Sequence, residues 1–357
     1  MHFGLNEDQT MLQDSVGRYL EGASELALVR GFVDGEPALA GDLQTGLMDL
    51  GVPLVLIPAE HGGLGMGVLE AALIQEALGR NVSPSPFTAA YGMAVVALRA
   101  CKSDEWLGRI ASGEVVMGVG ATEAIGAREG AGLTLSGDKV SGRASFVMGA
   151  EAATHFLLTT GEQLLIVERG GAGIEEVALT TIDKTRHVVN LDLDGASAHL
   201  LAGNNHVEAQ NKMIDAGRVL LAADTLGAAS MMLEKAVAYS KEREQFNRPI
   251  GSFQAVKHMC AEMAAKLEPC RSLVWYAAYA QDNVPEEAAL TSRLAKSHVS
   301  EVGKFVARTS TEVHGGMGFT DLLGLHYWFK RIGANRQLLG GPQAVRDEAA
   351  QLQGFVG

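Results

Sequence analysis

The sequence has few cysteines and no concentration of positive charge. Its 357 residues include only three cysteines, and their spacing fits neither a metal site nor a redox motif. We therefore expect reduced thiols and no metal centre. The formal net charge of −13 argues against a general nucleic-acid-binding protein, because tracking a phosphate backbone requires clustered Lys and Arg.

Long hydrophobic runs and an N-terminal signal are also missing. No apolar run reaches the ~18 residues that a transmembrane helix needs, and residues 1–8 have no basic stretch before an apolar one. We therefore expect a cytoplasmic protein without a membrane span. Hydrophobic residues make up 47% and charged residues 20%, which is typical of a folded globular chain. The length suits two or three packed regions.

The spacing of apolar residues divides the chain into three parts. Residues 1–112 show helical spacing, and Asn6 is a candidate N-cap. Residues 113–204 contain short apolar runs separated by Gly, Asp and Ser, which predict a small, mainly antiparallel β domain. Residues 205–357 contain at least three helical stretches of ~20 residues or more, enough for a four-helix bundle. We therefore predict an α+β fold: an N-terminal helical domain, a central antiparallel β domain and a C-terminal four-helix bundle.

Residues 243–254 are the first candidate ligand-binding segment. Pro249 and Gly251 break the chain there, between two predicted helices. Arg243 could simply be favoured by the dipole at the end of its helix, or it could donate paired hydrogen bonds to a diphosphate. In the second case Phe246 would offer a flat apolar surface and Gln254 a polar contact.

Residues 314–320 form the second candidate segment, His-Gly-Gly-Met-Gly-Phe-Thr. One glycine after a helix is a common C-cap. Three glycines in four residues exceed that need and let the backbone approach a ligand closely. The segment is not a P-loop, because no Lys-Ser/Thr pair follows it.

Taken together and in this order, the two segments resemble the acyl-CoA dehydrogenase family. The resemblance covers nearly the whole chain, including the glycine-rich turn at residues 62–65 and the Thr122-Glu123 pair. It implies FAD bound at a dimer interface and dehydrogenation of an acyl-CoA thioester between its α- and β-carbons. A glutamate takes the α-proton in this family, and flavin N5 takes the β-hydride. An electron-transfer flavoprotein or a similar acceptor is the implied redox partner.

In this family two subunits hold each FAD, and one of them contacts the diphosphate and adenosine. The residues that match this half are the predicted cofactor-binding residues of this chain. Glu312 stands where the family usually has a glutamine. The full set is Arg243, Phe246, Gln254, Glu312, Gly315 and Gly316.

The half that contacts the flavin ring departs from the family pattern. Arg128 stands where the family has a serine near the thioester. The family's Trp-Ile-Thr run corresponds to Phe146-Val147-Met148. Phe146 can still pack on a ring, but Met148 cannot offer the hydroxyl that the threonine offers to flavin N5.

Both family positions of the catalytic glutamate carry glycine, namely Gly217 and Gly340. Glycine cannot accept a proton, and a general base contributes roughly 10²–10⁴-fold to the rate. Asp215, Glu242 and Asp321 lie near these motifs, but each is more simply explained as a solvated or capping residue. We therefore predict no catalytic residue in this chain.

Keeping the diphosphate half and losing the ring half is what a partner subunit requires. Residues 338–342, Leu-Leu-Gly-Gly-Pro, resemble the short subunits of heterotetrameric family members from bacterial steroid side-chain catabolism. This resemblance predicts a non-catalytic subunit beside a sister chain that binds the acyl-CoA. Two alternatives stay open: a self-sufficient homomeric dehydrogenase with a displaced acid, and a scaffold or electron-transfer partner that uses the fold only for protein contacts.

Overall fold

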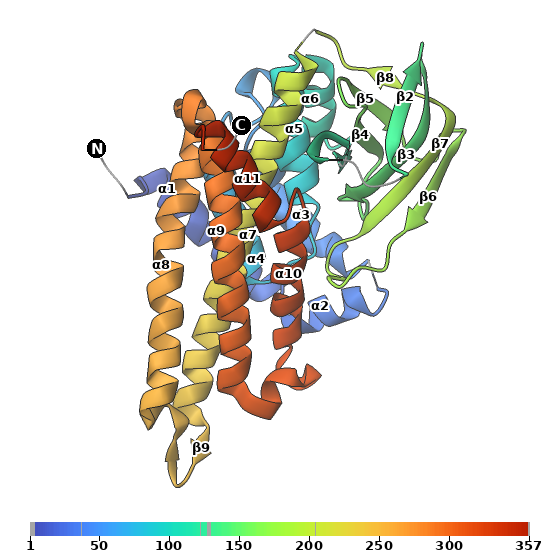
Figure 1. The fold of residues 1–357 in the computed structure, drawn as a ribbon. Helices are drawn as coiled ribbons and strands as arrows, with labels where there is room; N and C mark the ends of the chain where they lie inside the picture. The colour runs from blue at the N-terminus through green and yellow to red at the C-terminus, as the bar shows by residue number, and fades with distance from the viewer. Residues whose placement is uncertain (1–3, 37, 122, 127–129, 204, 356–357) are drawn as a thin grey trace.

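The structure is a computed structural model that describes residues 4–36, 38–121, 123–126, 130–203 and 205–355. Helices form one side of the molecule and a β-sheet packs beside them (Figure 1). The predicted order of a helical part, a β part and a second helical part is confirmed.

The N-terminal helices begin at a capped residue, as predicted. The Asn6 side chain accepts a hydrogen bond from the Gln9 backbone N–H at 2.8 Å, and the Gln9 side chain accepts one from the Asn6 N–H at 2.9 Å. This capping box satisfies two backbone donors at the helix start. The helices of this part are α1 (Glu7–Ala23), α2 (Leu26–Val33), α3 (Leu39–Asp49), α4 (Val68–Arg80), α5 (Ala94–Ala100) and α6 (Asp104–Ala111). Short turns of helix connect them at η1 (Val52–Leu54), η2 (Ala59–His61) and η3 (Thr88–Met93).

The central sheet has eight strands in the order β6-β7-β3-β1-β4-β5-β8, with β2 paired to β3. All of its described pairings are antiparallel except β1 with β4. The register between β3 and β7 shifts between Ala144 and Val147, and Phe146 in this bulge has a φ of 55°. The strands are β1 (Met117–Gly120), β2 (Gly132–Ser136), β3 (Lys139–Met148), β4 (His155–Thr159), β5 (Leu164–Glu168), β6 (Ile174–Ala178), β7 (Val188–Ser197) and β8 (His199–Leu200). The turn η4 (Glu123–Ile125) follows β1.

Three long helices dominate the C-terminal part, and α10 packs against two of them. α7 is the longest and is buried on most of its faces. α9 begins with Pro285 at its first position and acidic residues in its first turn, as predicted. The elements are α7 (His206–Glu242), β9 (Glu244–Gln245), β10 (Arg248–Pro249), α8 (Gln254–Asn283), α9 (Pro285–His314), α10 (Leu325–Gln337) and α11 (Pro342–Leu352), with the turns η5 (Ile250–Ser252), η6 (Gly315–Phe319) and η7 (Asp321–Leu323).

α7 is also long and apolar enough to cross a membrane by length and composition. However, 83% of its most apolar 18-residue window is buried inside the protein, as expected for the core helix of a bundle. No other helix in the described part of the chain passes the same test.

The chain passes from helices to strands near residue 112, and from strands back to helices near residue 204. α6 ends at Ala111 and β1 begins at Met117, while β8 ends at Leu200 and α7 begins at His206. Residues 1–112, 113–204 and 205–357 remain our proposal for the three domains.

Candidate functional site

The first predicted segment forms a hairpin at the far tip of the bundle (Figure 1). Arg243 ends α7, and its backbone is tied on both sides to Tyr239 and Ile250 at 2.8 Å. Within the described residues, no hydrogen bond or ion pair engages its guanidinium group. Phe246 sits at the turn with a φ of 53° and is 85% exposed. The hairpin therefore presents a cation and an aromatic ring to a ligand or to another chain.

The second predicted segment has three glycines with three different roles. Gly315 has φ 57° and ψ −139°, a conformation that in practice only glycine adopts. A Cβ on Gly318 would lie 2.7 Å from the carbonyl oxygen of Thr311, so packing excludes a side chain there. A Cβ on Gly316 would meet no atom within 4 Å. Of these three glycines, Gly316 alone has neither a positive φ nor a packing contact that requires glycine, and it is exposed.

A ring stack brings the two segments to the same end of the molecule. Tyr239, one turn before Arg243, stacks on His314 with ring centroids 4.6 Å apart. His314 directly precedes the glycine loop and also bonds to the Ser310 carbonyl at 2.7 Å. The stack fixes the end of α9 against the end of α7. The hairpin and the glycine loop therefore lie at the same end of the bundle.

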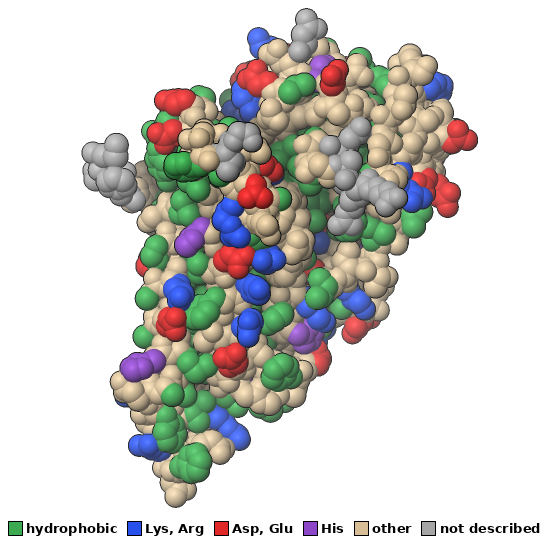
Figure 2. Space-filling model, viewed as in Figure 1, with side chains coloured by type: hydrophobic (Ala, Val, Ile, Leu, Met, Phe, Trp, Pro, Cys, Tyr) green, Lys and Arg blue, Asp and Glu red, His purple; other side chains and the backbone are tan. Residues whose placement is uncertain are grey.

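The remaining two predicted residues are exposed on the neighbouring helices. Gln254 begins α8 and its amide contacts the His258 ring at 2.8 Å. Glu312 lies in the last turn of α9. Large apolar side chains surround this end: Phe319 is 80% exposed and Leu322 is 71% exposed. Figure 2 shows hydrophobic and basic side chains together at the hairpin tip. Such exposed apolar groups mark an interaction surface.

The residues that match the family's flavin-ring half lie elsewhere, around a cavity of about 380 Å³ that we call the main cavity. It lies between the sheet, residues 179–188 and α10, and its lining is mostly apolar. Phe146, Met148 and Leu338 line it, and the ring-side role of the first two stays a prediction. Thr122 and Arg128, the other ring-side candidates, lie outside the described residues.

A side chain at either of the two base positions would require neighbouring side chains to move. A Cβ on Gly217 would lie 2.6 Å from Leu339 Cδ1 and 2.8 Å from Met93 Sδ. Gly340 has a φ of 101°, and a Cβ there would lie 2.9 Å from Val345 Cγ2. Real Cβ atoms do not approach other atoms this closely. Neighbouring side chains therefore pack against both positions, and neither position carries a carboxyl group.

The three acids near these motifs lie in other surroundings than the main cavity. Asp215 is buried and accepts hydrogen bonds from Ser292 at 2.9 Å and Arg293 at 2.7 Å. Burial raises the pKa of Asp215, and its neighbour Arg293 opposes that rise. Glu242 is exposed at the end of α7, and Asp321 pairs with His326 at 2.6 Å on the surface. None of the three lines the main cavity.

Next to Gly217, Arg218 locks the loop that carries Gly340. Its guanidinium donates to the two carboxylate oxygens of Glu348 at 2.7 and 2.8 Å. Its Nε donates to the Leu339 carbonyl at 3.0 Å. This pairing holds Leu339 against Gly217 and keeps the base position filled.

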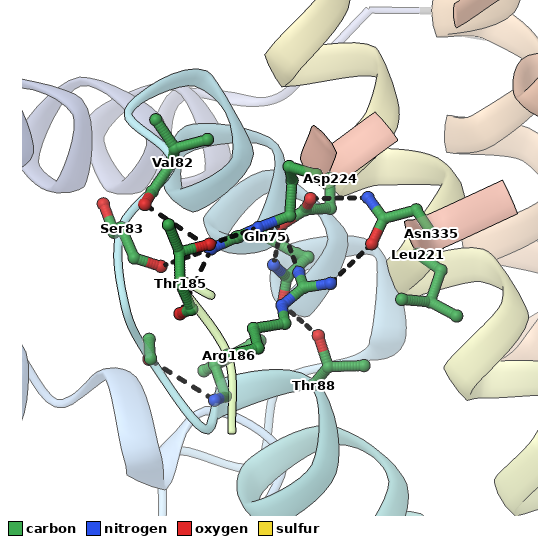
Figure 3. Close-up of polar contacts among 12 residues, drawn as sticks. Gln75, Val82, Ser83, Thr88, Thr185, Arg186, Leu221, Asp224 and Asn335 are labelled. Carbon is green, nitrogen blue, oxygen red and sulfur yellow. Dashed lines mark hydrogen bonds and ion pairs between the residues drawn. The ribbon is translucent and has the colours of Figure 1, made fainter. Parts of the chain in front are cut away.

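A buried polar cluster, not foreseen from the sequence, joins the three parts of the chain behind the main cavity (Figure 3). Asp224 of α7 is fully buried and accepts hydrogen bonds from Gln75 and Arg186 at 2.6 Å and from Asn335 at 2.7 Å. Arg331 of α10 lies between Asp224 and Asp183 and pairs with the latter at 2.8 Å. Asp224 interrupts an apolar run in the sequence. A charged residue in such a run could have indicated a buried polar cluster.

Comparisons with known proteins agree with this architecture. Residues 6–114 match the description "Acyl-CoA dehydrogenase, N-terminal domain" and residues 207–351 match "Acyl-CoA dehydrogenase, C-terminal domain". Acyl-CoA dehydrogenase IpdE2 of Mycobacterium tuberculosis is 31% identical over 95% of both chains. Its counterpart in Mycolicibacterium smegmatis is 28% identical over 99% of this chain and 100% of that one.

Two solved structures of multi-subunit relatives superpose closely. The ChsE4-ChsE5 complex from Mycobacterium tuberculosis has a TM-score of 0.88 and 25% identity, covering 100% of both chains. The Tcur3481-Tcur3483 steroid ACAD G363A variant has a TM-score of 0.88 and 26% identity, covering 98% of both chains. The chain belongs to the acyl-CoA dehydrogenase family, whose members bind FAD.

Proposed function

We propose that this chain is the non-catalytic subunit of a heteromeric, FAD-dependent acyl-CoA dehydrogenase. It completes the FAD diphosphate site of a sister subunit, which binds the acyl-CoA and supplies the base. The observation that carries this proposal is a contrast between two places in one chain. The Arg243 guanidinium makes no hydrogen bond or ion pair among the described residues, and Gly316 is exposed, whereas a side chain at either base position would displace neighbouring side chains.

The residues at the bundle tip have the chemistry of a diphosphate site. An arginine forms charge-assisted, paired hydrogen bonds with phosphate oxygens. An uncrowded glycine backbone lets a phosphate or ribose come close. Arg243, Gly315 and Gly316 would hold the diphosphate, while Phe246, Gln254 and Glu312 would contact the adenosine side. When bound, FAD supplies the hydride acceptor for α,β-dehydrogenation.

The relatives support a particular class of complex and substrate. One structural neighbour is a two-protein complex and another is described as a steroid ACAD. We therefore propose a sister dehydrogenase subunit as the direct partner and a steroid-derived acyl-CoA as the substrate of the complex. Electron-transfer flavoprotein or a similar acceptor would reoxidise the flavin, and the complex would work in the cytoplasm.

The test is the flavin content of the complex purified with its sister chain. We expect about one FAD per pair of unlike subunits. Arg243→Ala should weaken FAD binding roughly 10- to 150-fold, because a charge-assisted hydrogen bond is lost. Lys241→Ala is the matched control, since it removes an exposed cation from the same turn of α7, and it should leave the flavin content unchanged.

Two results would contradict this assignment. One FAD on every chain, with acyl-CoA oxidation by this chain alone, would establish the self-sufficient homomeric enzyme, the alternative that the open main cavity favours. Unchanged flavin content in the Arg243→Ala complex would instead establish a scaffold that uses the fold only for protein contacts.

A further inference from the structure

A cleft of about 250 Å³ lies among the helices, and we call it the helix cleft. The start of α4, the end of α5, the N-terminal third of α7 and the end of α8 form its walls. It shares no lining residue with the main cavity, and none of the predicted cofactor-binding residues lines it. The helix cleft is therefore separate from both halves of the family's flavin site.

The guanidinium group of Arg99 is the cation at this cleft that lacks hydrogen-bond partners. The Arg99 side chain is 35% exposed, and the nearest approach of the Asp282 carboxylate to it is 3.9 Å, too far for a hydrogen bond. Within the part of the chain that the structure describes, the guanidinium donates no hydrogen bond. Since a guanidinium has five N–H donors in a fixed fork, Arg99 has donors available for a ligand.

Asp282 does not turn toward Arg99 because the start of α4 holds its carboxylate. Its Oδ2 accepts a hydrogen bond from the Val68 backbone N–H at 2.6 Å. This bond satisfies one of the backbone donors that a helix start leaves free. A Cβ at position 67 would lie 2.8 Å from the same oxygen, so Gly67 leaves room for the contact. A closer pair with Arg99 would cost α4 this cap.

Lys212 brings a second positive charge to the cleft. It pairs with Glu208, one turn earlier on α7, at 2.7 Å, and about half of each side chain is exposed. An exposed pair of this kind contributes little to stability, so the Lys212 ammonium group can turn to a ligand. The cleft also has an apolar surface, made of Val68, Val96, Ala100 and Ala216.

We propose that the helix cleft binds a small organic carboxylate. The carboxylate lies between Arg99 and Lys212, and its apolar body lies on Val96 and Ala100. Arginine binds carboxylates through paired, charge-assisted hydrogen bonds, and the two cations outnumber the single carboxylate in the lining. The cleft is smaller than the roughly 300–1,000 Å³ of sites for drug-sized ligands, so it suits a compact molecule. This site goes beyond the proposed FAD role.

The test compares benzoate with benzamide, a neutral molecule of nearly the same shape. Binding of each to the full-length chain is measured by ligand-observed NMR titration. We expect benzoate to bind at least about tenfold more tightly, because only benzoate forms charge-assisted bonds on both oxygens. Arg99→Gln should remove this preference. Arg346→Gln is the matched control, since it removes an exposed cation of α11 outside the cleft, and it should keep the preference.

A second variant tests the apolar part of the site. Ala100→Leu fills the cleft without changing charge and should weaken the binding of both probes. Inorganic phosphate at the same concentration should not displace benzoate, because phosphate has no apolar body. Thermal unfolding of each variant checks that it is folded.

Three outcomes overturn the proposal: equal binding of benzoate and benzamide, a preference for benzoate that survives in Arg99→Gln, or benzoate binding that Ala100→Leu leaves unchanged and phosphate competes away. The last of these would show ion pairing at the surface only. The FAD content of the Arg99→Gln complex with the sister chain should equal that of the wild type. Failure at Arg99 and failure of the proposed FAD role are therefore separate results.

Discussion

The buried amino group of Lys296 should make stability depend on pH in a defined window. Lys296 lies in α9 and is 1% exposed. Its Nζ donates to the carbonyl oxygens of Asn335 at 2.8 Å and of Arg336 and Gly340 at 3.2 Å. It thus ties the end of α10 to the loop that carries Gly340. Burial, with Arg218 and Arg336 nearby, lowers the pKa of Lys296 from 10.5 to about 7.

The sign of the effect follows from proton linkage. Below pH 7 both the folded and unfolded chains hold this proton, and above pH 10.5 neither does. Between these values the unfolded chain binds more protons, so the free energy of unfolding rises with pH. From pH 7 to pH 9 the rise is at most about 2 kcal/mol, because the three carbonyl acceptors favour the charged form and limit the shift.

Urea denaturation of wild type and Lys296→Met at pH 7, 8 and 9 measures this rise. The variant loses a donor to three carbonyls, so its stability is lower at every pH. The informative quantity is the difference in pH slope between the two proteins, since other titrating groups contribute equally to both. Equal slopes would refute the inference that Lys296 sheds its proton in the folded state within this window.

Three further predictions concern buried contacts and the bundle tip. Asp224→Asn leaves the buried Arg186 without its ion-pair partner and should destabilise the protein by about 3–5 kcal/mol in thermal unfolding, whereas Glu234→Gln, at a surface ion pair, should change stability by less than about 1 kcal/mol. Gly217→Ala places a Cβ against packed side chains and should destabilise the protein by about 1–3 kcal/mol. The control Gly108→Ala, in an open helical position, should stabilise it by up to about 1 kcal/mol. Destabilisation by both variants would contradict tight packing around Gly217. Gly316→Ala should leave the unfolding temperature of the chain unchanged but lower the flavin content of the complex, and unchanged flavin would place Gly316 outside the site.

The sequence predicts the order of the three parts because the spacing of apolar residues along the chain differs between them. Helical spacing before residue 112 and after residue 205 and short runs between them are local signals. The two segments at the bundle tip were also recognisable, since their residue types and order are specific. Their proximity in space was not, because the Tyr239–His314 stack joins positions far apart in the chain.

Packing around the two glycines could not be foreseen. The sequence shows that Gly217 and Gly340 lack a carboxyl group, but only the fold brings Met93 and Leu339 against the first of them. The polar cluster is a similar case, since Asp224 and Arg331 are 107 residues apart. The helix cleft at Arg99 is another such case, because its walls come from four different helices.

The closed position at Gly217 also limits how this chain can change. A glutamate there would have to displace the side chains of Met93 and Leu339, which pack against the position. Leu339 is further held by Arg218, which is itself held by Glu348. A larger residue at position 217 is therefore expected to lower stability unless these neighbours rearrange. If this chain is the non-catalytic subunit that we propose, this packing would help to keep it so.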